Sequence, residues 1–140
     1  MTPFVYTRRV EFGETDMAGI MHFSNYFRYM EAAETAFLRT RGLSVNWADG
    51  GVQYGFPRVS VACDYVRPVR FEDELQIAVI LEKVGTKSVQ YRYEFRRGEA
   101  EIATGRITAV FCRSVHHGPF ESIAISAAIR GKLEPASDLP

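Results

Sequence analysis

The chain lacks long hydrophobic runs, a signal-like N-terminus and an excess of charge of either sign. No apolar stretch approaches the ~18 residues that a membrane-spanning helix needs, and the first charged residues follow the apolar ones instead of preceding them. The seventeen basic and seventeen acidic residues cancel and form no block of like charge. These absences argue against a membrane or a nucleic acid as the partner of this protein.

Cysteine is also scarce. Cys63 and Cys112 lie far apart, with no CxxC motif and no Cys/His spacing of the kind that zinc or redox sites use. We therefore expect two buried free thiols in a cytoplasmic protein, with neither a disulfide nor a metal site. The pair His116-His117 precedes Gly118-Pro119 and has no third ligand nearby in the sequence, so it is interpreted as a polar turn.

The hydrophobic residues that are present suffice for one core. The chain has 140 residues, of which 46% are hydrophobic and 13% aromatic. This length predicts one domain spanning residues 1–140. The polar segment 134–140 is expected to be a frayed tail.

The first half of the chain predicts one strand and one long helix. Alternating apolar and polar residues predict a strand from residue 4 to residue 12, ended by Gly13. Apolar residues that recur at steps of three and four then predict an amphipathic helix, capped by Ser24 or Asn25 and running to about Arg41. Gly42 is expected at the position just after that helix. Residues 43–57 are interpreted as a loop that holds a short turn of helix.

Four strand-like segments follow, at residues 59–66, 75–81, 89–96 and 102–113. The short links near Gly85 and Gly98 are typical of hairpins, so the sheet should be largely antiparallel. A short amphipathic segment, 123–133, comes last. The predicted fold is α+β, with a five-stranded antiparallel sheet against one long central helix.

The segment between the first strand and the helix carries the chemistry. Asp16 lies at a turn of small residues, and His22 comes just before the helix. The first backbone N–H groups of a helix have no partner within the helix, and the helix dipole makes them a site for negative charge. An acid, an imidazole and such a helix start are the groups needed to attack an acyl carbonyl and stabilise the resulting oxyanion.

The run EFGETDMAGI (residues 11–20), followed by Asn25-Tyr26, resembles the signature of the 4-hydroxybenzoyl-CoA thioesterase-like hotdog proteins. With His22 it is similar to the YbgC-type acyl-CoA thioesterases within that group. The resemblance covers about residues 4–115. It implies a hotdog fold, in which a curved sheet wraps around the helix. It also implies homodimers or homotetramers joined through their sheets, with active sites at the dimer interface.

The resemblance implies that Asp16 is the catalytic carboxylate, acting as nucleophile or as general base. From the residues alone, Asp16 could instead cap its own turn. His22 is a candidate to orient water or protonate the leaving thiolate, or it satisfies only local backbone groups. The backbone N–H of Phe23 is the candidate oxyanion donor. Glu14 is interpreted as a solvated loop residue, or else as a carboxylate paired with Asp16.

Five further residues are candidates for substrate binding. Gly19 permits the tight turn ahead of the helix, and Tyr26 could line an acyl pocket or belong to the core. Lys87 and Ser88 lie where relatives carry a basic cluster for CoA phosphates, although a solvated hairpin lysine is the alternative. Arg58 could contact phosphate or pair with Asp64 or Asp73.

The sequence therefore predicts an acyl-CoA thioesterase that releases a free acid and CoA, with no metal or other cofactor. Two alternatives remain open. One is a thioesterase for acyl groups on acyl carrier protein, for which the neutral surface offers no evident basic patch. The other is a non-catalytic acyl-CoA-binding module of the same fold.

Overall fold

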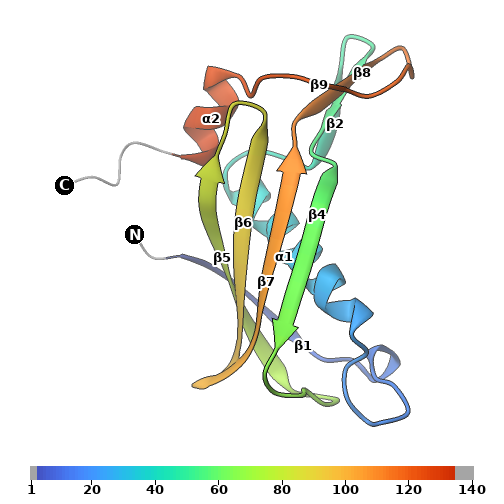
Figure 1. The fold of residues 1–140 in the computed structure, drawn as a ribbon, viewed down its shortest axis with the longest axis vertical. Coiled ribbons are helices and arrows are strands. Elements are labelled where there is room, and N and C mark those ends of the chain that lie inside the picture. The colour runs from blue at the N-terminus through green and yellow to red at the C-terminus, as the bar shows by residue number, and fades with distance from the viewer. Residues whose placement is uncertain (1–2, 135–140) are drawn as a thin grey trace, which may run out of the picture.

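The computed structural model describes residues 3–134 (Figure 1). The elements follow in the order β1 (Phe4–Arg9), a 3-10 turn η1 (Phe12–Glu14), α1 (Ser24–Thr40), β2 (Asn46–Asp49), β3 (Val52–Gly55), β4 (Arg58–Tyr65), β5 (Glu74–Val84), β6 (Ser88–Arg97), β7 (Ala100–Val110), β8 (Cys112–Val115), β9 (Glu121–Ser122) and α2 (Ala127–Leu133). Of the predicted frayed tail, Glu134 donates its backbone N–H to Arg130. The remainder of that tail, 135–140, lies outside the described residues.

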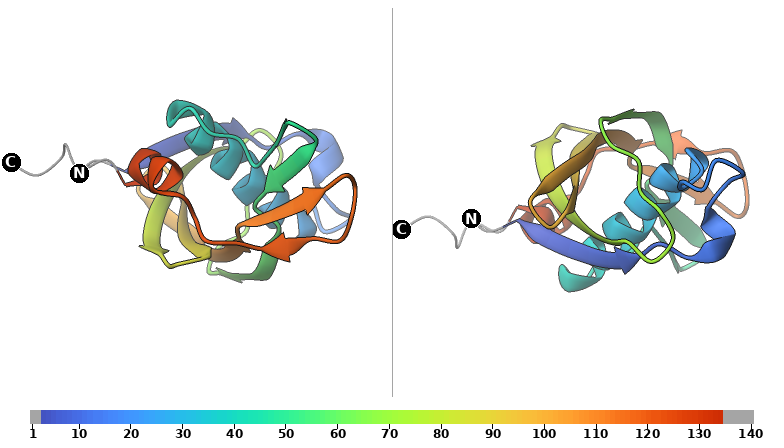
Figure 2. Two further views of the ribbon diagram at one scale, coloured as in Figure 1. Left: turned by 90° about the horizontal axis from the view of Figure 1, so that it is seen from above. Right: turned by 90° about the horizontal axis from the view of Figure 1, so that it is seen from below.

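An antiparallel sheet with the strand order β1-β5-β6-β7-β4 curves around α1, which lies along its concave face (Figures 1 and 2). The buried stripe of α1, which includes Tyr29, Met30, Ala33 and Phe37, packs against this sheet. The closest approach is at Gly105 of β7, where an added Cβ would overlap the Met30 side chain. A glycine in a strand commonly marks such a close approach. The predicted α+β class with an antiparallel sheet is confirmed.

A second sheet, with the order β2-β3-β8-β9, was not predicted. The expected loop at 43–57 instead contains the β2–β3 hairpin, whose turn is made by Gly50 and Gly51 at φ values of +58° and +80°. The last predicted strand is divided at Phe111 into β7 and β8. Part of the amphipathic segment 123–133 forms the short helix α2. The prediction of a single sheet and a single helix was therefore incomplete.

The boundaries around the candidate site also differ from the prediction. β1 ends at Arg9, earlier than expected, because residues 12–14 turn as η1. No side chain caps α1: Phe23 is the N-cap, and the Ser24 hydroxyl contacts His22 instead. Gly42 has the predicted role, with a φ of +70° just after α1.

Both cysteines are free thiols, as predicted; Cys112 is buried and Cys63 is half-buried. No helix within residues 3–134 is long and apolar enough to cross a membrane.

Candidate active site

Residues 15–21 form a tight loop that projects Asp16 beside the start of α1. A bridge between Thr15 and Met21 closes the loop, and the backbone N–H of Asp16 donates to Ile20 at 2.9 Å. Gly19, with a φ of +79°, donates to the carbonyl of Asp16 at 2.9 Å. This left-handed conformation favours glycine, as predicted.

The two oxygens of the Asp16 carboxylate have different surroundings. Oδ1 accepts a hydrogen bond from the backbone N–H of Ala18 at 2.8 Å. Oδ2 has no hydrogen-bond partner among residues 3–134, and the side chain is exposed. The carboxylate thus caps its own turn and still presents one oxygen, so the structural role and the chemical role are compatible.

Asp16 lines two neighbouring clefts. The smaller, of about 430 Å³, is lined by Asp16, Ile20, Met21, Phe23, Tyr26, Tyr65, Val66, Arg67 and Pro68. The other, about 780 Å³ and open, contains His22 with Asp16, Glu14 and Arg28 among its lining residues. The structure therefore brings Asp16, Phe23 and Tyr26 together on one cleft and places His22 on the neighbouring one.

Phe23 precedes the first turn of α1. The N–H groups of Asn25 and Tyr26 bond to the carbonyls of His22 and Phe23, at 3.0 and 3.3 Å. Within the described part of the chain, the Phe23 N–H has no acceptor. An unpaired donor at a helix N-terminus can bind a developing negative charge.

Ser24, the first residue of α1, holds the His22 ring in place. The His22 Nδ1 accepts from the Ser24 N–H at 3.3 Å and lies 2.8 Å from the Ser24 hydroxyl. Because Nδ1 is an acceptor, the neutral ring carries its proton on Nε2. The ring stacks on Phe23 with centroids 4.5 Å apart, so its position is fixed from two sides.

Tyr26 lines the smaller cleft and is 4% exposed. Its ring packs on Tyr65 of β4, with centroids 4.7 Å apart. Burial, assisted by the nearby Cys63 and Tyr65, raises the pKa of Tyr26 to about 12. Tyr26 therefore keeps its hydroxyl proton at neutral pH and is available as a donor.

Glu14 is an internal anchor and not the solvated residue that we expected. Its side chain, 13% exposed, accepts from Arg8 at 2.7 Å and from the Tyr29 hydroxyl at 2.5 Å. Burial and this bond to the carboxylate raise the pKa of Tyr29. The Glu14 carbonyl accepts from the His22 N–H at 2.8 Å. Because Arg8 and Tyr29 occupy the carboxylate, Glu14 is not a paired acid for Asp16.

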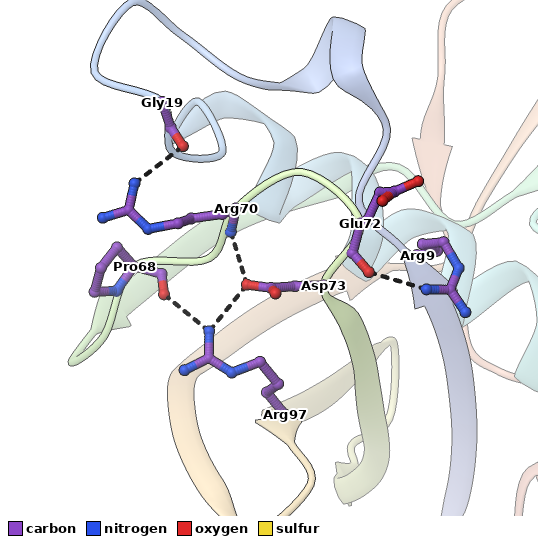
Figure 3. A network of polar contacts seen from close by, with 7 residues as sticks. All are labelled: Arg9, Gly19, Pro68, Arg70, Glu72, Asp73 and Arg97. Carbon is purple, nitrogen blue, oxygen red and sulfur yellow. Dashed lines mark hydrogen bonds and ion pairs between the residues drawn. The ribbon is translucent and has the colours of Figure 1, made fainter.

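A second polar network supports the opposite wall of the smaller cleft (Figure 3). Asp73 accepts from the backbone N–H of Arg70 at 2.8 Å and pairs with Arg97 at 2.9 Å. Arg97 also donates to the carbonyl of Pro68 at 3.4 Å, and Arg70 donates to the carbonyl of Gly19 at 3.4 Å. The segment 66–73 is thereby tied both to the sheet and to the Asp16 loop.

The remaining candidates for substrate binding lie elsewhere in the chain. Arg58 pairs with the buried Glu34 and with Glu31, so its charge is already compensated by α1 and the predicted partners Asp64 and Asp73 were wrong. Lys87 and Ser88 lie at the β5–β6 turn, at the far end of the sheet from the Asp16 loop (Figure 1).

Sequence reasoning missed two cleft residues, Tyr65 and Arg67. The predicted strand 59–66 ends beside these residues, yet nothing in the local pattern shows that the strand end faces the Asp16 loop. That contact depends on the hydrogen bond from the Met21 N–H to the Val69 carbonyl, at 2.8 Å. It joins residues 48 positions apart and has no local signal.

Known proteins resemble this chain in sequence and in fold. Residues 10–133 match the sequence profile of the thioesterase-like superfamily. A protein of Aquifex aeolicus named "Putative esterase" is 37% identical over 102 residues, covering 72% of this chain and 78% of that protein. A 1,4-dihydroxy-2-naphthoyl-CoA hydrolase of Nostoc punctiforme is 29% identical over 100 residues, covering 71% of this chain and 68% of that protein. The solved structure of a gentisyl-coenzyme A thioesterase superposes with a TM-score of 0.80 at 27% identity, covering 94% of this chain and all of that one.

Proposed function

The chain belongs to the thioesterase-like superfamily, and from this membership we propose that it hydrolyses acyl-CoA thioesters to a free carboxylic acid and CoA. The observation that carries the proposal is that one cleft is lined both by Asp16, whose carboxylate is exposed, and by Phe23, whose backbone N–H has no acceptor among residues 3–134. Hydrolysis needs a group that attacks or activates water and a donor that stabilises the oxyanion.

In the proposed reaction, the thioester carbonyl lies in the smaller cleft with its oxygen toward the Phe23 N–H. The free oxygen of Asp16 either attacks the carbonyl carbon or removes a proton from an attacking water. The C–S bond then breaks. On the general-base route, Asp16 passes the proton taken from water to the CoA thiolate. On the nucleophilic route, a water then hydrolyses the acyl–Asp16 anhydride, which releases the free acid, regenerates Asp16 and supplies the proton to the thiolate. Through its Nε2–H, His22 is proposed to donate a hydrogen bond to the departing sulfur from the neighbouring cleft.

The cleft walls favour an aromatic acyl group. Tyr26 and Tyr65 offer ring faces and edges, and the pKa of Tyr26, raised to about 12, keeps its hydroxyl available as a donor. The 1,4-dihydroxy-2-naphthoyl-CoA hydrolase and the gentisyl-coenzyme A thioesterase described above are both named for aromatic acyl-CoA thioesters. This chemistry requires no metal and no redox cofactor. The free thiols of Cys63 and Cys112 suit a reducing compartment such as the cytoplasm.

The proposed active unit is a homodimer joined along β4, alone or within a homotetramer. β4 is an edge strand of the larger sheet. Its residues Val61 and Tyr65 face the side of the sheet on which α1 packs, yet they are 49% and 46% exposed. A long edge strand with uncovered apolar residues is a site for pairing with another chain.

Thiol release from aromatic, short and long acyl-CoAs tests the proposed function, with wild type and Asp16→Asn in parallel. Asparagine keeps an oxygen that can accept from the Ala18 N–H, so the turn should survive while the carboxylate is lost. We expect turnover of an aromatic acyl-CoA and a loss of ~10²-fold or more in kcat in the variant. No turnover of any acyl-CoA would refute the proposed activity, and an equally active variant would refute the role of Asp16. Carrier-bound acyl groups are the next substrate to test.

A further inference from the structure

A second pocket lies at the end of the molecule opposite the Asp16 loop. Its lining residues come from the second sheet, from the segment that follows α1, and from α2 with the segment that leads into it. Figure 1 shows the second sheet and α2 at this end of the molecule. Its volume is about 690 Å³, within the usual range for small-molecule sites. None of its lining residues borders either cleft beside Asp16. Within one chain it is therefore separate from the clefts beside Asp16.

One wall of this pocket is an aromatic surface. Trp47 and Tyr54 are directly opposite each other in the β2–β3 register, and Tyr54 is opposite Arg113 of β8. Residues that are paired in this way lie on the same face of a sheet. The rings of Trp47, Tyr54 and Phe111 are nearly parallel, with interplanar angles of 11–23° and centroids 5.6–6.0 Å apart. Phe111 is buried, whereas Trp47 and Tyr54 remain half-exposed.

The rest of the lining combines apolar side chains with one cation that has no carboxylate partner among residues 3–134. Leu43, Ile123 and Ile129 supply apolar contacts. Arg113 already pairs with Glu121 at 3.4 Å. By contrast, Lys132 of α2 has no carboxylate within 4.0 Å among residues 3–134. Asp49 is the one carboxylate among the lining residues. Because Asp49 repels anions, the pocket suits a ligand with no more than the single negative charge that Lys132 can compensate.

We propose that this pocket binds a small planar aromatic monoanion, with its ring against Trp47 and Tyr54 and its carboxylate at Lys132. Ring faces and a nearby cation are the groups that recognise a benzoate-like molecule. A ligand with several phosphates fits less well, since it would meet Asp49 with only one uncompensated cation to offset it. The proposal goes beyond the thioesterase activity and does not depend on it.

Trp47 is the only tryptophan in the chain, so tryptophan fluorescence reports on this pocket directly. We would titrate the purified protein with benzoate, and in parallel with benzyl alcohol, which lacks the charge, cyclohexanecarboxylate, which lacks the flat ring, and adenosine monophosphate, which carries more charge. The expected result is a saturable change in emission with benzoate at lower concentrations than with any of the other three. Tighter binding of any of those three than of benzoate would overturn the proposed ligand class.

Three variants locate the binding site. Lys132→Gln should weaken benzoate binding by about fivefold, the upper end for a solvent-exposed charge pair. Lys83→Gln, at an exposed lysine of β5 that does not line the pocket, should bind as wild type. Asp16→Asn should keep the full Trp47 response even where it loses thioesterase activity. No saturable response in wild type, or unchanged affinity in Lys132→Gln, would overturn the proposal.

Discussion

At the scale of single residues, Asp16 and Glu14 show what a sequence pattern can and cannot reveal. The Asp16 turn was predictable because it is made by neighbours: Ala18 and Gly19 bond to Asp16 within three positions. Glu14 was misjudged because its partners, Arg8 and Tyr29, lie six and fifteen positions away. The polar neighbours of Glu14 in the sequence suggested that its side chain is solvated, whereas the fold pairs it with the Arg8 guanidinium and the Tyr29 hydroxyl.

The buried bond between Tyr29 and Glu14 should contribute measurably to stability. Tyr29 is fully buried and donates to a carboxylate, so Tyr29→Phe should lower the free energy of unfolding by about 1.5–3 kcal/mol, as hydrogen bonds to charged groups do. Urea denaturation measures the loss. Tyr6→Phe is the matched control, because the half-buried Tyr6 hydroxyl has no partner among the described side chains. Equal effects of the two substitutions would contradict the anchor role of Glu14.

Tyr26 should make the protein less stable in alkali. Its pKa is raised from 10.0 to about 12 in the fold, so the folded state holds its proton where the unfolded state has lost it. The stability is complete below pH 10 and falls as the pH rises toward 12. Unfolding of Tyr26→Phe by urea across this range should show a shallower decline than wild type.

The pKa of the Cys63 thiol, raised from 9.0 to about 12 by burial, adds to the same decline. Cys63→Ala should therefore also reduce the slope, beginning near pH 9. An alkaline decline in Tyr26→Phe as steep as that of wild type would show that the Tyr26 hydroxyl is not protected by the fold.

At the scale of elements, long regular segments were predictable and short ones were not. α1 and the strands β5, β6 and β7 have seventeen, eleven, ten and eleven residues, enough for their periodicity to be clear. β2 and β3 have only four residues each, which is too few for a clear periodicity, so the sequence pattern around Gly50-Gly51 predicts a loop. A Gly-Gly pair between two short apolar runs is in fact a hairpin signal. The cleft wall at 66–73 has no regular structure at all, and polar contacts hold it in place.

Arg97 should position that wall for catalysis. Arg97→Ala removes the bonds to Asp73 and Pro68, so the segment that carries Arg67 along the cleft loses its tie to β6. We expect kcat/KM to fall about tenfold or more, since small misplacements in an active site are costly. The free energy of unfolding should change by less than about 1 kcal/mol, because both groups of the pair are partly exposed.

Arg106→Ala is the control for this prediction. It breaks a comparable pair, Arg106 with Glu82 at 2.6 Å, on strands of the same sheet but outside the cleft. Its stability cost should be similar, and its kcat/KM should match wild type. Equal losses of kcat/KM in the two variants would mean that the Asp73–Arg97 pair only stabilises the sheet.

At the scale of the whole molecule, the candidate residues are divided between two ends. Asp16 and Phe23 lie near Tyr65, where β4 ends, whereas Lys87 lies near its start: the Phe111 N–H donates to Lys87 and the Val110 N–H donates to Pro57. The eight residues of β4 span about 23 Å at ~3.3 Å each. One chain therefore does not bring Lys87 to Asp16, whereas an antiparallel partner along β4 would bring its own Lys87 toward that residue.

Breaking the edge of β4 should consequently abolish both assembly and activity. Val61→Glu places a charge on the exposed apolar face of that edge strand, and sedimentation should show monomers with little thioesterase activity. Val5→Glu, at 47% exposure on the opposite edge strand β1, is the matched control and should remain assembled and active.

Mixing Asp16→Asn subunits with Lys87→Gln subunits tests whether Asp16 of one subunit acts together with Lys87 of its partner. In a mixed dimer, one site has both wild-type groups, so activity should exceed that of either variant alone. Activity in monomeric Val61→Glu, or no recovery on mixing, would place the whole site within one chain.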